Sequence, residues 1–115
     1  MFDFEKFEVY KQAKAFLSDI TALIEGHRPL GGRIADQLYR AALSIPLNIA
    51  EGAGRYSKPD KRNYYTVARG SVFECTAIID ILYDKGALDA AQKEHYYNAL
   101  EEISKMLSGL INSLK

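Results

Sequence analysis

The sequence has no tryptophan, one cysteine and three prolines among its 115 residues. A single cysteine, Cys75, excludes a disulfide within the chain and is typical of a protein in a reducing cytoplasm. No apolar run approaches the roughly 20 residues that a membrane-spanning helix needs, so we expect no membrane partner. The N-terminus begins with acidic residues rather than a basic region before an apolar one, and it therefore does not predict a signal peptide.

The chain also lacks net charge, because fifteen basic and fifteen acidic residues cancel. As a whole it gives no signal for binding a polyanion. Residues 33–69 nevertheless carry seven Lys or Arg against three Asp or Glu, a local charge of +4. Any attraction for nucleic acid should therefore come from this central part of the chain.

Hydrophobic periodicity predicts four helices and no strands. They are expected over residues 4–25 and 33–54, from the cap residue Ser57 to about residue 85, and from the cap residue Asp89 to the C-terminus. A turn at residues 26–32 and other short links join them. The sequence thus predicts one all-α domain over residues 1–115, an antiparallel up-down-up-down four-helix bundle. The core stripe expected on the third helix is Tyr64, Ala68, Ser71, Cys75, Ile78, Ile79 and Leu82.

The second helix has apolar side chains on two opposite sides. The stripe expected to face the core is Ile34, Leu38, Ala41, Ile45, Ile49 and Gly52; the stripe opposite is Tyr39, Leu43, Leu47 and Ala50. A helix buried on one side only does not need the second stripe. We interpret Tyr39, Leu43 and Leu47, with the outward Phe73 of the third helix, as an interface between copies of the chain. A helix central to its own bundle is the alternative.

Pro46 lies in the middle of this pattern. It removes one backbone donor and its ring presses on the carbonyl four residues earlier, which predicts a kink. Two helices that meet at Pro46 are the alternative, but the stripes keep their phase across the proline and favour one kinked helix.

A polar stripe runs beside the two apolar ones. Asn48 and Glu51 need partners if an assembly buries them, and Arg33, Arg40 or Arg69 would supply those partners. We interpret Arg40, Asn48, Glu51 and Arg69 as a structural hydrogen-bond network that fixes helix register or subunit orientation. A ligand site is the alternative.

The usual signs of catalysis are missing. Neither His27 nor His95 has a second histidine or a cysteine at ligand spacing, so we expect no metal site. Cys75 lies on a core stripe, as a small buried hydrophobe would. The paired glycines match no phosphate-binding loop. We expect neither an enzyme nor a bound cofactor.

The link between the second and third helices combines positive charge with an aromatic ring. Basic groups attract phosphate, tyrosine stacks on bases, and free amides at a helix N-terminus favour anions. A solvated turn is the alternative. The residues expected to bind nucleic acid are Arg55, Tyr56, Lys58, Lys61 and Arg62.

The same region resembles the signature of the four-helix bundle proteins encoded in 23S rRNA intervening sequences. The first motif is Q-L-x-R-A-A-x-S-I-x-x-N-I-A-E-G-x-G-R over residues 37–55, and the second is A-x-G-S-x-x-E over residues 68–74. Residues 4–16 resemble the start of the family and residues 105–115 its end. The resemblance thus covers essentially the whole chain.

This resemblance implies a bacterial antiparallel bundle that assembles as a homopentameric ring. It also implies kinship with the accessory protein of diversity-generating retroelements, a basic barrel that binds nucleic acid and a reverse transcriptase. This chain departs from that relative in having no net charge. We expect a cytoplasmic, non-enzymatic homo-oligomer that binds RNA or DNA or assists a nucleic-acid enzyme. The alternative is an oligomeric scaffold that binds another protein and no nucleic acid.

Overall fold

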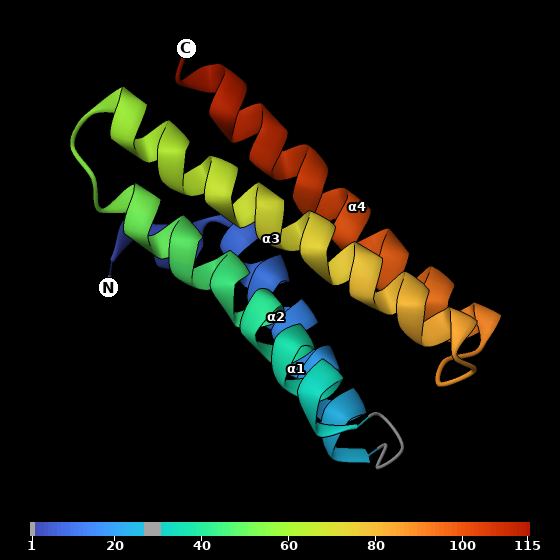
Figure 1. Cartoon of the computed structure of the whole chain (residues 1–115). Coiled ribbons are helices and arrows are strands. Elements are labelled where there is room, and N and C mark those ends of the chain that lie inside the picture. Colours follow the sequence, from blue (N-terminus) through green and yellow to red (C-terminus); the bar gives the residue numbers. More distant parts are fainter. Residues whose placement is uncertain (1, 27–30) are drawn as a thin grey trace.

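The computed structural model describes residues 2–26 and 31–115, and within these it contains helices and no strand. Four helices pack in an up-down-up-down bundle (Figure 1). In this bundle α1 and α3 each contact both α2 and α4. This confirms the predicted all-α four-helix bundle. The elements are η1 (Asp3–Lys6), α1 (Glu8–Gly26), α2 (Gly32–Ala53), α3 (Lys58–Asp84) and α4 (Ala90–Ser113).

Side-chain caps start the last two helices where the sequence predicts them. The Ser57 hydroxyl accepts a hydrogen bond from the amide of Asp60 at 3.2 Å. Asp89 and Gln92 form a reciprocal capping box, with N–O distances of 2.7 and 2.9 Å. Gly86 follows the end of α3 with a φ of +79°, a left-handed conformation that glycine adopts without a steric penalty. These residues determine where α3 begins and ends and where α4 begins.

The first predicted helix differs from the observed one. Residues 3–6 form a separate 3₁₀ helix, and Phe7 has extended backbone angles before α1 begins. The break lets the Phe4 ring contact the Tyr10 ring edge-on, with the centroids 4.9 Å apart. Residues six apart on one continuous helix point about 120° away from each other, so the break favours this contact. The turn predicted at residues 26–32 lies mostly outside the described residues.

α2 continues through Pro46, whose side chain is buried. The alternative of two helices that meet at the proline is therefore wrong. The predicted inner stripe of α2 faces the core. Its outer stripe does not, since Tyr39 and Leu47 are 42% and 55% exposed. The alternative in which α2 is surrounded by its own bundle is also wrong.

The core contains the predicted apolar positions, with one correction on α3. Tyr65 is buried there, whereas Tyr64, which we expected, is half-buried. Residues 64 and 65 lie on either side of the line that points from α3 into the core. The ring of Tyr65 fills the space beside Gly52. Cys75 is fully buried, and burial raises the pKa of its thiol to about 12. A buried neutral thiol is a poor nucleophile.

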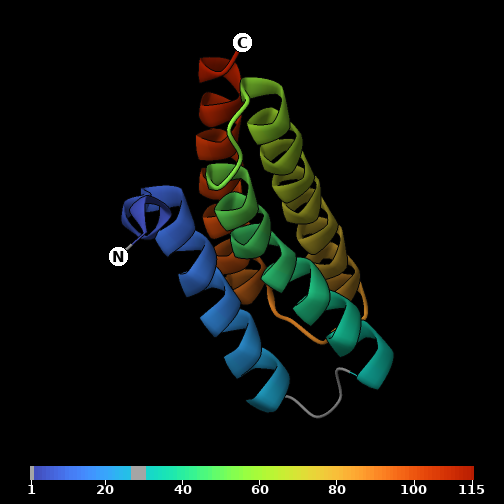
Figure 2. The ribbon, with the colours of Figure 1, turned by 90° about the vertical axis from the view of Figure 1, so that its left-hand side faces the viewer.

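α2 and α3 approach each other closely at Gly52. A Cβ atom at this position would lie 2.8 Å from Cε1 of Tyr65 and 3.1 Å from Cβ of Tyr64. Glycine therefore allows the end of α2 to touch the start of α3, which suits the short link between them. The link and the end of α4 consequently lie at the same end of the bundle (Figure 2).

None of the described helices combines the length and hydrophobicity needed to cross a membrane.

We predict that Gly52→Ala destabilises the protein by about 1–3 kcal/mol, because the added Cβ would lie 2.8 Å from the buried ring of Tyr65 and one of the two would have to shift. Gly109→Ala is the matched control, since a Cβ there would meet nothing within 4 Å. It should stabilise α4 by roughly 0.5–1 kcal/mol. Urea unfolding measures both changes, and equal effects would contradict the close contact at Gly52.

Candidate nucleic-acid interface

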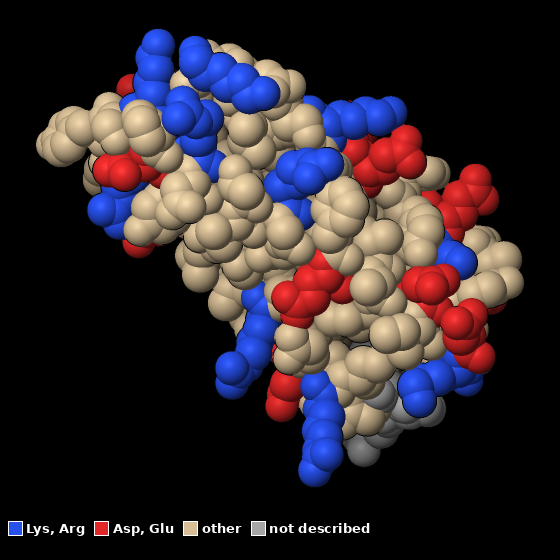
Figure 3. Space-filling view, turned by 45° about the horizontal axis from the view of Figure 1, so that its top comes forward, with Lys and Arg blue, Asp and Glu red and all other residues tan. Residues whose placement is uncertain are grey.

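The five residues predicted to bind nucleic acid lie at the end of the bundle where α2 joins α3. Lys and Arg side chains gather over this end of the molecule (Figure 3). The structure brings the C-terminal turn of α4 to the same place, because Arg62 donates a hydrogen bond to the carbonyl oxygen of Leu114. Lys115 therefore adjoins the cluster. Lys115 is 53 residues beyond Arg62 in the sequence, so no local pattern indicated that the two lie close together.

Arg55 is held within the chain by two neighbours. Its guanidinium forms an ion pair with Glu51 at 3.1 Å and donates a hydrogen bond to the hydroxyl of Tyr64 at 2.6 Å. The same group lies 4.6 Å from the centroid of the Tyr64 ring. Arg55 therefore adds little net charge to the cluster and stiffens the junction between α2 and α3.

Lys61 and Arg62 bind carbonyl oxygens at the ends of helices. The ammonium of Lys61 lies 3.0 Å from the oxygen of Ala53 and 3.5 Å from that of Gly52, at the C-terminus of α2. Arg62 reaches the last turn of α4 in the same way. Cations at these positions complement the helix dipoles. Because the acceptors are neutral carbonyl groups, these hydrogen bonds do not compensate the positive charges of Lys61 and Arg62.

Tyr56 and Lys58 are the freely exposed members of the cluster. Tyr56 is 102% exposed, so its ring has essentially no contact with the rest of the described chain. Lys58 is also exposed, and its ammonium has no bonding partner within residues 2–26 and 31–115. Tyr56 borders a shallow hollow of about 680 Å³ that Leu47 and Ser57 also line. An aromatic ring, a free cation and open space thus lie together at the link.

The predicted polar network forms around Asn48, but with different partners. The amide of Asn48 donates to the carbonyl and hydroxyl oxygens of Ser44 at 2.8 and 2.9 Å. The hydroxyl of Ser44 lies 2.8 Å from that of Ser71 on α3. These side chains are buried or half-buried, and together they join α2 to α3. Ser44 lies on the same polar stripe of the sequence as Asn48 but was not assigned to the network, and Ser71 was assigned to the core stripe of the third helix.

The charged residues assigned to that network lie elsewhere. Glu51 pairs with Arg55, and Arg69 donates to the hydroxyl of Ser108 on α4 at 3.0 Å. Arg40 is exposed and has no hydrogen bond or ion pair with any described residue. The structure therefore does not bring Arg40, Glu51 or Arg69 to Asn48.

The predicted interface residues occupy two separate places. Tyr39, Leu43 and Leu47 follow the outer side of α2, with Leu43 half-buried. Phe73, which is 55% exposed, lies on α3 beside a groove of about 560 Å³ between α3 and α4. The guanidinium of Arg69 covers its ring at 4.7 Å. The chain thus has two apolar surfaces, one on each side of α3.

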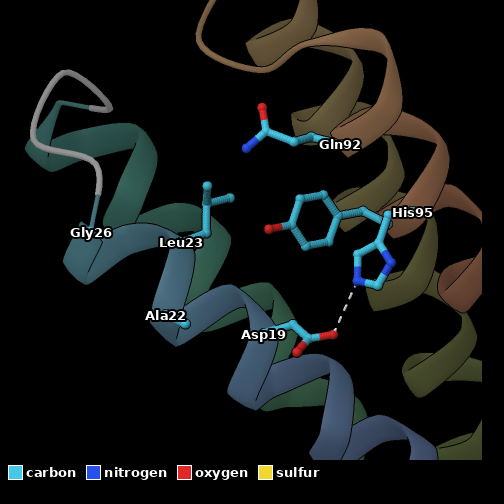
Figure 4. Close-up of a pocket in the computed structure, with 7 residues that line it drawn as sticks. Asp19, Ala22, Leu23, Gly26, Gln92 and His95 are labelled. Atoms are coloured by element: carbon cyan, nitrogen blue, oxygen red, sulfur yellow. Dashed lines mark hydrogen bonds and ion pairs between the residues drawn. The ribbon is translucent and has the colours of Figure 1, made fainter.

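The structure also pairs a histidine that the sequence left isolated. His95 on α4 lies 3.4 Å from the carboxylate of Asp19 on α1, at the edge of a hollow of about 640 Å³ (Figure 4). Gln92 and Leu23 border the same hollow. Within the described residues no group of three or more His, Cys, Asp or Glu side chains is placed to hold a metal ion. His27 lies outside those residues.

The family model of the 23S rRNA-intervening sequence protein matches residues 5–109. The chain belongs to this family. No match was found among curated proteins.

A solved structure with the same fold is a protein of unknown function from the S23 ribosomal protein family of Bacteroides thetaiotaomicron. The two chains are 24% identical, and the match has a TM-score of 0.85 over 90% of this chain and 97% of the other. It confirms the architecture of the bundle.

The motif that resembles this family corresponds largely to the contact between α2 and α3. Within residues 37–55, Ser44 and Asn48 form the buried hydrogen bonds, and Gly52 provides the close approach. Gln37 donates to the carboxylate of Glu74 at the other end of the contact. In this chain, the motif residues therefore contribute to the packing of α2 against α3.

We predict opposite effects from removing two lysines of the cluster. Lys61→Met should destabilise the protein by about 0.3–1 kcal/mol, because the carbonyls at the end of α2 lose their cation. Lys58→Met should leave stability unchanged or raise it slightly, since a cation in the first turn of α3 is unfavourable. Thermal unfolding measures both. A loss of stability in Lys58→Met alone would contradict these roles.

Proposed function

We propose that this protein is a non-enzymatic homo-oligomer of the bacterial cytoplasm that binds RNA through the end of each bundle. The observation that carries the proposal is Tyr56, fully exposed next to Lys58 at the link between α2 and α3. Lys61 and Arg62 keep their charges nearby. Base stacking on tyrosine and phosphate contacts to lysine are the two contributions that bind single-stranded nucleic acid without strict sequence preference.

Self-association is supported by the apolar side chains that the single chain leaves in water. Leu47 is 55% exposed on α2, and Val67 and Ile81 are exposed on α3. Gly70 lies on α3 in open surroundings, although glycine in a helix interior is unfavourable. A second copy packed closely against α2 and α3 would bury these side chains and account for the glycine.

The position of Phe73 favours a ring over a two-fold dimer. Phe73 borders the groove between α3 and α4, whereas Leu47 borders the hollow at the link, and the two cavities share no lining residue. A contact that joins two different surfaces is head-to-tail, and such contacts form a ring where the rotation between copies closes and an open filament where it does not. The resemblance implies five copies, which would repeat the basic end around the ring and strengthen a weak site by avidity.

Leu47→Glu should dissociate the oligomer into 12.9 kDa chains that remain helical, because a carboxylate cannot be buried without a partner. Ala15→Glu on the exposed side of α1 is the control and should keep the native assembly. Light scattering gives the mass and circular dichroism the helix content. Leu47→Glu with an unchanged mass would exclude the outer side of α2 as the interface.

Tyr56→Ala should weaken binding of an RNA hairpin with an unpaired loop by roughly tenfold, since one stacked base contributes about 1–3 kcal/mol. Lys58→Gln should lower the slope of log affinity against log salt by about 1. Lys85→Gln at the other end of α3 is the control and should change neither. Fluorescence anisotropy at two salt concentrations measures all three, and wild-type binding that does not depend on salt would contradict the proposal.

A second candidate is an oligomeric scaffold that binds another protein and no nucleic acid. The groove between α3 and α4 favours it, because Val72 and Leu100 form its floor and Phe73 its edge. The two candidates differ in the same RNA titration. An intact oligomer that binds no RNA would support the scaffold.

A further inference from the structure

A lysine on α4 is enclosed by two aromatic rings and a carboxylate. The ammonium of Lys93 lies 4.5 Å from the centroid of the Tyr83 ring and 5.1 Å from that of Tyr97. It also donates a hydrogen bond to Asp80 at 3.0 Å. Asp80 and Tyr83 come from α3, whereas Lys93 and Tyr97 come from α4. This cluster is separate from the basic end and from the α2 stripe.

The arrangement is that of a binding site for an organic ammonium ion. The faces of aromatic rings carry negative charge, and cages of such rings bind lysine, methylated lysine and quaternary ammonium groups. The carboxylate of Asp80 adds a hydrogen-bond acceptor. Tyr83, Lys93 and Tyr97 line a hollow of about 330 Å³ that Glu94 and Glu101 also border. The hydrogen bond to Asp80 also raises the pKa of Lys93, so the occupant stays charged.

Lys93 is partly open to solvent in this cluster. Its side chain is 27% exposed and that of Asp80 is 49% exposed, so water reaches the ion pair. Lys105, about three turns further along α4, provides a comparison, since it pairs with Glu101 at 3.2 Å and no tyrosine ring of the described residues covers it. The tyrosines therefore add to Lys93 a contact that an ordinary surface ion pair lacks.

We propose that Asp80, Tyr83 and Tyr97 form a binding site for organic ammonium groups, and that Lys93 closes it as an internal ligand. The ligand class is an alkylammonium, carried by the lysine of a partner protein or by a small molecule. A tethered occupant has a high effective concentration. An external ammonium ion therefore binds the wild-type chain weakly. It binds more tightly once the ammonium group of Lys93 is removed.

The test is a titration of Lys93→Met, which keeps most of the stem and removes the ammonium. Tetramethylammonium chloride is added to the full-length protein while the NMR signals of the Tyr83 and Tyr97 rings are followed, with sodium chloride as the ionic control. The expected result is a saturable shift at a concentration about tenfold below that for wild type. Lys105→Met should behave like wild type, and Tyr97→Leu added to Lys93→Met should abolish the shift.

A second titration with Nα-acetyl-lysine amide separates the two ligand sources. A primary ammonium donates to Asp80, so adding Asp80→Asn to Lys93→Met should weaken its binding more than that of tetramethylammonium. A preference for the lysine amide indicates a protein partner, and a preference for tetramethylammonium indicates a small quaternary ion.

Wild-type protein provides a measurement that does not depend on the folding of any variant. The ring currents of Tyr83 and Tyr97 shift the side-chain signals of Lys93, and tetramethylammonium should return them toward those of Lys105. If neither Lys93→Met nor the wild-type chain shows a saturable change, the cluster only clasps α3 to α4 and the proposal is overturned.

Discussion

The close approach of α2 and α3 is the constraint on which the rest of this structure depends. Gly52 lets the end of α2 touch Tyr65, and the hydroxyls of Ser44 and Ser71 meet about two turns further along the contact. The short link that this contact permits brings a cap, several cations and an exposed tyrosine to one end of the bundle. The packing of α2 against α3 therefore determines where the residues of the candidate nucleic-acid interface lie.

This view separates what the family motif describes from what the protein does. In this chain, motif residues within α2 form part of the contact to α3. The residues proposed to bind RNA lie at the end of that motif and beyond it. Three of the cations there also serve the structure, since Arg55, Lys61 and Arg62 each bind a group of the chain itself. The side chains of Tyr56 and Lys58 make no such contact with the described residues.

The sequence predicted the four helices, their caps and most of the core, because periodicity and capping are local signals. It did not predict which tyrosine faces Gly52, because residues 64 and 65 flank the core direction almost equally. It also missed contacts between residues far apart in the chain, such as His95 with Asp19 and Lys93 with Asp80. Those pairs depend on the rotation of one helix against another, which a pattern within a single helix does not encode.

The most direct test of the oligomeric interpretation is the solution mass of the wild-type protein, measured by light scattering over a range of concentrations. We predict one oligomeric species that is stable on dilution, because the exposed apolar side chains of α2 and α3 need a partner surface. The resemblance implies that its mass is five times that of the 12.9 kDa chain. A single species of 12.9 kDa at every concentration would contradict that interpretation, and with it the repetition of the basic end around a ring.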